Sequence, residues 1–208
     1  MNAKWITQIG SSSTLALTLA LVAAGCGTET HFFSTWSSNE AQPVSVAGAQ
    51  IATVFFNTNE SVRREGEDVM VNEVARFGGV SYPSYKILSQ DPSDRERSKA
   101  ELTKAGVEAV LSMRVIAAER VGTYGPDYFS GPYYGSLWGY WGYGWGSGYD
   151  YTSLIVRVET MLYSLKDDKL LWAGMSETFD PDDVDSAVKS IARKAIKKMD
   201  EEGVLSRF

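Results

Sequence analysis

The sequence predicts an α/β fold, in which a single domain has a mixed β-sheet packed by about three helices. Strand-like and helix-like segments alternate along residues 47–208, in the order β-α-β-α-β, an aromatic and glycine-rich loop, then β-β-α. The chain has 208 residues, of which 44% are hydrophobic and 22% charged. This size and composition suit one globular domain preceded by an additional amino-terminal segment.

The first strand and the first helix have the clearest patterns. Residues 49–56 are nearly all apolar and include β-branched residues, as in a strand buried on both faces. Residues 60–77 place apolar side chains on one helical face, directly after Thr58 and Asn59, which can cap the helix. Gly66 lies on that same face, so the helix can approach the sheet closely. A shorter strand is expected at residues 82–89.

The second helix is expected between Asp91 and Ala105. Proline at position 92 suits the first helical turn, and Ser93 with Glu96 has the spacing of a capping box. Gly106 follows and ends the helix.

The remaining elements are three strands and a final helix. Residues 107–121 and 152–165 alternate between apolar and polar side chains, and residues 170–174 complete a hairpin with the second of these strands. The acidic run 180–183 caps a helix at about 183–200, which has an apolar stripe and a face rich in lysine and arginine. The stripe predicts packing on the sheet in preference to insertion into a membrane.

Residues 1–25 have the pattern of a signal peptide. Lys4 is followed by the apolar stretch 15–24 and then by small residues. A stretch of ten residues is too short to cross a bilayer as a helix, which takes about 20. We therefore expect residues 1–25 to be removed during export.

The segment Leu21–Cys26 resembles the lipobox of bacterial lipoprotein precursors, although Ala23 stands where leucine is more common. The resemblance implies cleavage before Cys26, a diacylglycerol on its sulfur and an acylated amino terminus. Gly27, in place of aspartate, implies the periplasmic face of the outer membrane if the cell is Gram-negative. The alternative is a secretory signal followed by a free cysteine.

Residues 26–46 are expected to form a lipidated tether. They are rich in serine and threonine and show no regular period. The aromatic residues Phe32, Phe33 and Trp36 are expected to pack either at the membrane interface or on the domain. The tether is short, so the domain at 47–208 should sit close to its membrane.

The segment 122–151 is an insertion of nine glycines and twelve aromatic residues among its 30 positions. Long loops inside a compact domain are usually functional or disordered. The alternatives are a loop whose rings pack on the domain, a site for self-association or a partner, and a surface for membrane insertion or glycan stacking. The candidate interaction surface comprises Trp138, Tyr140, Trp141, Tyr143, Trp145 and Tyr149.

Several kinds of chemistry lack the residues they need. The formal charge of -6 disfavours nucleic-acid binding, and His31 is the one histidine, so neither a catalytic triad nor a multi-histidine metal site is expected. The acidic run 180–185 lacks the glycine and glutamate of a calcium-binding EF-hand loop. We expect no cofactor and no metal, and we expect that the protein is not an enzyme.

Two segments of the predicted domain carry a resemblance to known proteins. The helix-to-strand pattern Lys104–Leu111 and the hairpin Leu162–Trp172 resemble a domain found in three groups of envelope proteins. These are the curli-secretion lipoprotein, lipoprotein activators of penicillin-binding proteins, and the amino-terminal domain of the Tol-Pal protein. The resemblance covers residues 49–200 and implies the fold more than a function. The chain lacks the long proline-rich tether of an activator that crosses the cell wall.

The predicted function is that of a membrane-anchored, non-enzymatic envelope lipoprotein with a binding or assembly role. Its expected partners are the membrane, through Cys26, and an envelope protein or a second copy of the chain. One alternative is an envelope hydrolase with its active site in the loops at the strand ends. Convergent polar groups in a cleft near residues 122–151 would favour it. The other alternative is the structural subunit of an oligomer.

Overall fold

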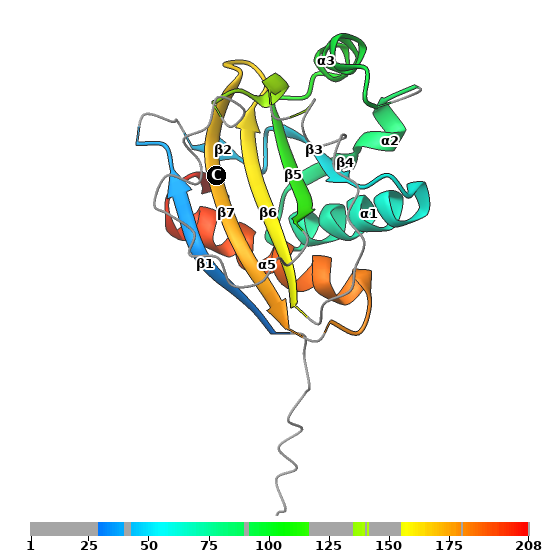
Figure 1. Ribbon diagram of the computed structural model, residues 1–208. Coiled ribbons are helices and arrows are strands. Elements are labelled where there is room, and N and C mark those ends of the chain that lie inside the picture. The colour runs from blue at the N-terminus through cyan, green and yellow to red at the C-terminus, as the bar shows by residue number, and fades with distance from the viewer. Residues whose placement is uncertain are drawn as a thin grey trace, which may run out of the picture.

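Strands and helices alternate around one large sheet in the computed structural model, which describes residues 29–39, 43–89, 92–116, 135–139, 141, 155–179 and 181–207 (Figure 1). The elements in chain order are β1 (Glu29–Ser37), β2 (Val44–Ser45), β3 (Gln50–Phe56), α1 (Glu60–Phe77), β4 (Val80–Pro83), α2 (Ser84–Ile87), α3 (Arg95–Lys104), β5 (Ala109–Ile116), β6 (Ile155–Ser164), β7 (Lys169–Phe179), α5 (Val184–Glu201) and β8 (Leu205–Ser206).

The large sheet has six strands in the order β1-β7-β6-β5-β3-β4. Strand β3 is parallel to both of its neighbours, β4 and β5, whereas β5, β6, β7 and β1 pair antiparallel in succession. The two edges of the sheet are therefore β1 and β4. This mixed sheet confirms the predicted α/β class.

One face of the sheet is covered by α1 and α5. Helix α1 has the predicted bounds, and the Asn59 side chain caps it by accepting hydrogen bonds from two backbone N–H groups. Gly66 permits the close approach, because a Cβ at this position would lie 2.7 Å from the ring of Phe55. Helix α5 begins at Asp183 with a reciprocal capping box and buries its apolar stripe, as predicted.

The other face has a second hydrophobic core, which α3 covers only in part. Leu102 of α3 packs there, together with Leu137, Trp138 and Trp141 from the aromatic and glycine-rich segment. Residues 137–139 form a helical turn in this position. The described part of the insertion is thus a structural layer that closes the second face.

The last predicted strand, 170–174, extends over Lys169–Phe179, and two other predicted boundaries are also wrong. The strand expected at 82–89 ends at Pro83, and α2 follows, because the carboxylate of Glu67 accepts hydrogen bonds from the first residues of that helix. The next helix begins after Asp94, whose side chain caps it, and not at Asp91. Both errors come from a tertiary contact or a competing cap that a local pattern does not reveal.

The predicted tether at 26–46 is wrong over residues 29–37, which form β1. The strand pairs antiparallel with β7 and points Thr30 and Phe32 inward, where Phe32 packs edge-on against Trp172 with ring centroids 5.8 Å apart. A bulge between Phe32 and Ser34 breaks the alternation, so the period is not visible in the sequence. Phe32 therefore packs on the domain.

Candidate functional site

The aromatic residues predicted to form an interaction surface divide into two groups. Tyr140, Tyr143, Trp145 and Tyr149 lie outside the described residues, as does Cys26. Trp138 and Trp141 are 5% and 0% exposed, so these two rings belong to the second core and not to a surface. They are buried because the helices on that side leave much of the sheet face to be covered by other side chains.

A cleft of about 500 Å³ lies where β3 and β4 end. Open α/β sheets commonly bind ligands at the carboxyl ends of their parallel strands. The residues that line it come from the turn after β3, the start of α1, α2 and the segment before α3. They are Asn57, Thr58, Glu60, Arg63, Arg64, Tyr85, Leu88, Ser89, Pro92 and Ser93. We call this feature the strand-end cleft.

One wall of the strand-end cleft presents an arginine and a tyrosine together. The guanidinium of Arg64 lies 5.0 Å from the ring centroid of Tyr85, and it also pairs with Glu60. The Tyr85 hydroxyl donates a 2.7 Å hydrogen bond to Asp68, and this bond raises the pKa of Tyr85. Arginine and tyrosine are enriched among the residues that contribute most to protein interfaces.

A buried carboxylate network lies beneath Arg63 and Tyr85, two of the residues that line the cleft. Glu67 of α1 is fully buried and accepts hydrogen bonds from Ser84 Oγ at 2.7 Å and the Tyr85 backbone N–H at 3.1 Å. It also lies 3.3 Å from the guanidinium of Arg63. Desolvation raises the pKa of Glu67, against the lowering effect of these partners. The network joins α1 to α2 and fixes the position of Arg63 in the cleft.

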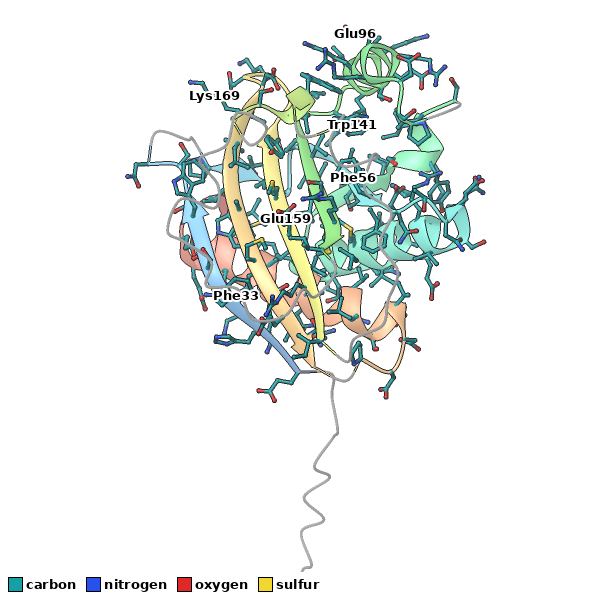
Figure 2. The ribbon with its side chains drawn as sticks, viewed as in Figure 1. Phe33, Phe56, Glu96, Trp141, Glu159 and Lys169 are labelled. Carbon is teal, nitrogen blue, oxygen red and sulfur yellow. The ribbon has the colours of Figure 1, made fainter. Side chains whose placement is uncertain are left out.

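The buried tryptophans support the back of the cleft. Trp141 donates a hydrogen bond of 2.9 Å from Nε1 to the carbonyl oxygen of Pro92, which lines the cleft. Figure 2 shows Trp141 close to Phe56, and their ring centroids are 5.8 Å apart with nearly perpendicular planes. Trp138 lies beneath Lys99 of α3 in a cation–π contact of 5.5 Å. The described residues of the aromatic segment therefore support the strand-end cleft and are not among the residues that line it.

Ser89, at the rim of the cleft, is hydrogen-bonded to a glutamate of α3. Ser89 donates hydrogen bonds to both carboxylate oxygens of Glu101, at 2.6 Å from Oγ and 2.8 Å from the backbone N–H. These bonds lower the pKa of Glu101 and so make it a weaker base for activating Ser89. His31 lies on β1, at the opposite edge of the sheet. Within the described residues, no cluster of side chains has the makeup of a metal site.

Exposed apolar side chains mark both edges of the sheet. Within the described residues, the large hydrophobic side chains that are exposed are Phe33 and Trp36 on β1 and Val80 and Tyr82 on β4. We call them the β1 pair and the β4 pair. Strand β4 leads directly into α2, so Tyr82 is the member of the β4 pair that is closer in the chain to the strand-end cleft. No helix in the part of the chain that the structure covers is long and apolar enough to span a bilayer.

The hydrolase alternative placed a site in the loops at the strand ends, but the sequence identified none of the residues that line the strand-end cleft. Its lining comes from segments that are separated along the chain, so no single motif contains it. The sequence pattern that could have indicated this cleft is Asn57-Thr58 at the end of a buried strand, followed by Arg63 and Arg64 in the next helix. Polar residues at the carboxyl end of a buried strand indicate a site only when the topology is known.

No family model and no curated protein matches the chain. Two solved structures of the PelC dodecamer from Paraburkholderia phytofirmans align with it. The first has a TM-score of 0.45 and 11% identity, and covers 81% of this chain and 95% of that chain. The second, a single-substitution variant, has a TM-score of 0.42 and 13% identity, and covers 78% of this chain and 96% of that chain. These values assign no function to the chain.

Proposed function

We propose that the chain is a lipid-anchored, non-enzymatic envelope protein that binds a protein partner at the strand-end cleft and the adjacent β4 pair. The observation that carries this proposal is the grouping of Arg64 and Tyr85 in a cleft of about 500 Å³, beside exposed Tyr82. Arginine and tyrosine in a preformed hollow are typical of the residues on which interfaces depend.

The anchoring part of the proposal rests on the lipobox-like segment Leu21–Cys26. The position of β1 supports it, because an edge strand that starts at Glu29 can carry an anchor at Cys26 without disturbing the core. The cleft belongs to the opposite edge of the sheet, at β4. An anchor at one edge leaves the other edge accessible to a partner.

The binding part of the proposal can be tested by photocrosslinking in cells. A photoreactive residue at Thr58, which lines the cleft, should crosslink a protein of defined mass, whereas the same residue at Thr35 on β1 should not. Replacing Arg64 and Tyr85 with alanine should reduce the Thr58 crosslink about tenfold or more, as expected for loss of residues that dominate an interface. Glu65→Ala, on the exposed side of α1, is the matched control.

Two results would contradict the cleft assignment. One is an unchanged Thr58 crosslink in the Arg64→Ala/Tyr85→Ala variant. The other is a crosslink to a second copy of the chain, which would identify the protein as a structural subunit of an oligomer.

Anchoring requires a separate test. Cys26→Ala should move the processed protein from the membrane fraction to the soluble fraction, since stable attachment depends on acyl chains. A cleaved, unlipidated product that remains in the membrane fraction would show that Cys26 is not the anchor.

A further inference from the structure

The β1 edge carries a surface that the strand-end cleft does not explain. Its position follows from the length of chain before it. Two residues separate Cys26 from Glu29, and three residue steps span about 10 Å at most. If Cys26 carries lipid, the start of β1 lies within about 10 Å of the bilayer surface. The domain then has little freedom to stand away from the membrane.

The side chains on this edge suit a lipid interface. Phe33 is 37% exposed and Trp36 is 42% exposed, and both belong to β1. Aromatic side chains, tryptophan above all, are favoured at the boundary between lipid headgroups and acyl chains. Figure 2 shows Phe33 on the outer strand of the sheet, away from the strand-end cleft.

Helix α5 places lysines beside the same strand. Lys194 donates a hydrogen bond to the carbonyl oxygen of Thr30, and Thr30 Oγ1 donates to Ser190 Oγ at 2.8 Å. The middle of α5, from Ser190 to Lys194, therefore lies along β1 (Figure 1). The apolar stripe of α5 is occupied by the sheet, so the helix does not insert into a bilayer, and its basic face points outward.

The second half of α5 carries more positive than negative charge. Arg193, Lys194, Lys197 and Lys198 lie there together with Asp200 and Glu201, whereas Asp185 lies in the first turn. Lys197 pairs with Glu201 at 3.4 Å but remains 75% exposed, and such surface pairs are weak. The β1 edge thus has Lys194 of α5 on one face of the sheet and exposed Trp36 on the other face, since Trp36 pairs with Ala173 of the second core.

We propose that β1 and the adjoining lysines of α5 form a surface that rests on anionic lipid. The β1 pair contacts the interface, the lysines contact lipid phosphates, and the strand-end cleft faces away from the membrane. Each lysine near an anionic surface contributes about 1 kcal/mol of attraction. This inference depends on the anchoring part of the proposed function, and it assigns an orientation that anchoring alone does not require.

The test uses the mature lipidated protein in vesicles of phosphatidylcholine and phosphatidylglycerol at about a two-to-one ratio. Cys26 is the one cysteine and lipid would occupy its sulfur, so a cysteine introduced by Thr35→Cys or Lys86→Cys would be the reactive thiol in each variant. Each receives a polarity-sensitive fluorophore, and quenching by aqueous iodide is measured. We expect the label on β1 to be about threefold less quenched than the label on α2, because it lies at the lipid interface.

Two variants test whether protection of the β1 label depends on this surface or on any exposed apolar pair. In the background Phe33→Ser/Trp36→Ser/Lys197→Gln/Lys198→Gln, the two labels should be quenched equally. Val80→Ser/Tyr82→Ser is the matched control, because the β4 pair is similarly exposed, at 48% and 43%, on the far edge. This control should keep the difference between the labels. In vesicles of pure phosphatidylcholine the difference should shrink, since the electrostatic attraction is absent.

Mass spectrometry of the amino-terminal peptide distinguishes the two proposals. An acylated Cys26 together with equal quenching at both labels in anionic vesicles would overturn the membrane-resting surface and leave the anchor intact. An unmodified Cys26 would refute the anchor itself. If the β1 label is protected only at a high ratio of protein to lipid, a second copy of the chain covers this edge. That result would also overturn the inference.

Discussion

Glu67 combines complete burial with several hydrogen bonds, and these act on its pKa in opposite directions. Its carboxylate connects Ser84, the backbone of Tyr85 and the guanidinium of Arg63. Desolvation is the largest effect and raises the pKa above the ordinary value of 4.5. The side chain that lies beneath Arg63 and Tyr85 of the strand-end cleft is therefore sensitive to pH.

Replacing Glu67 with glutamine should reveal this sensitivity. Because the folded-state pKa lies above 4.5, the folded protein holds the proton more tightly than the unfolded chain does. The contribution of Glu67 to the free energy of unfolding is therefore fully present below pH 4.5 and is lost as pH rises through the folded-state pKa. Glutamine does not titrate, so the stability of the wild type relative to Glu67→Gln should decrease with rising pH in urea titrations.

Glu101→Gln is the control, because it should change the pH dependence of stability in the opposite direction. Hydrogen bonds from Ser89 lower the pKa of Glu101, so its contribution is present above the unfolded value of 4.5 and is lost as pH falls. The stability of the wild type relative to Glu101→Gln should therefore increase with rising pH. Parallel pH profiles for the two variants would contradict both assignments.

The ion pair between Arg114 and Glu159 joins β5 to β6 in the interior. Both side chains are at most 2% exposed, and Arg114 Nε lies 2.9 Å from Glu159 Oε2. Arg114→Met should destabilise the protein by roughly 3–5 kcal/mol, because it removes the cation that is paired with a buried carboxylate. The double variant Arg114→Met/Glu159→Met should recover most of this loss in denaturant unfolding. A double variant less stable than the single one would contradict the explanation.

At the scale of elements, β1 is attached through a contact that requires glycine. A Cβ at Gly174 on β7 would lie 2.7 Å from ring atoms of both Phe32 and Trp172. Gly174→Ala should cost about 1–3 kcal/mol, as overpacking of a filled core does. The loss should appear as faster amide hydrogen exchange in β1 than in β5.

Gly48→Ala is a suitable control for this prediction, since the nearest atom to an added Cβ there is Ser45 Oγ at 3.9 Å. It should leave both stability and exchange in β1 nearly unchanged. Equal effects of the two substitutions would show that the position of Gly174 against Phe32 is not the cause.

The elements that the sequence predicts well are those whose patterns are local. Helix α1 is predicted with its bounds, because its apolar face and Asn59 cap are both visible in the sequence. Strand β1 is not predicted because a bulge at Phe32 interrupts its period, and α2 is not predicted because Glu67, distant in sequence, holds its first turn. The residues that line the strand-end cleft could not be predicted, because their proximity depends on which strands are neighbours in the sheet.

At the scale of the whole molecule, the sheet separates two cores, and the aromatic segment contributes to one of them. Trp141 is fully buried, whereas Trp36 is 42% exposed. Trp141→Ala should therefore cost roughly 3–5 kcal/mol in thermal or denaturant unfolding. Trp36→Ala should stay within about 0.5 kcal/mol of the wild type. A small effect at Trp141 would mean that the second core does not depend on the segment.

Variants of the aromatic segment must take into account that some of its residues are buried in the second core. Deleting residues 123–150 would remove Leu137, Trp138 and Trp141 from the second core and destabilise the domain. A variant that keeps residues 135–141 preserves those contacts. Only such a variant can separate an interaction role of the segment from its structural one.

The hydrogen bond between Thr30 and Thr178 spans 148 positions of the chain, and this separation affects the order of folding. Strand β1 is made early, but its partners β7 and α5 are made nearly last. During synthesis the apolar residues Phe32, Phe33 and Trp36 therefore remain without their native neighbours while most of the chain is still being produced. Segments in this condition are the ones most exposed to aggregation. A chaperone that engages the nascent chain would find its longest-lived target at this strand.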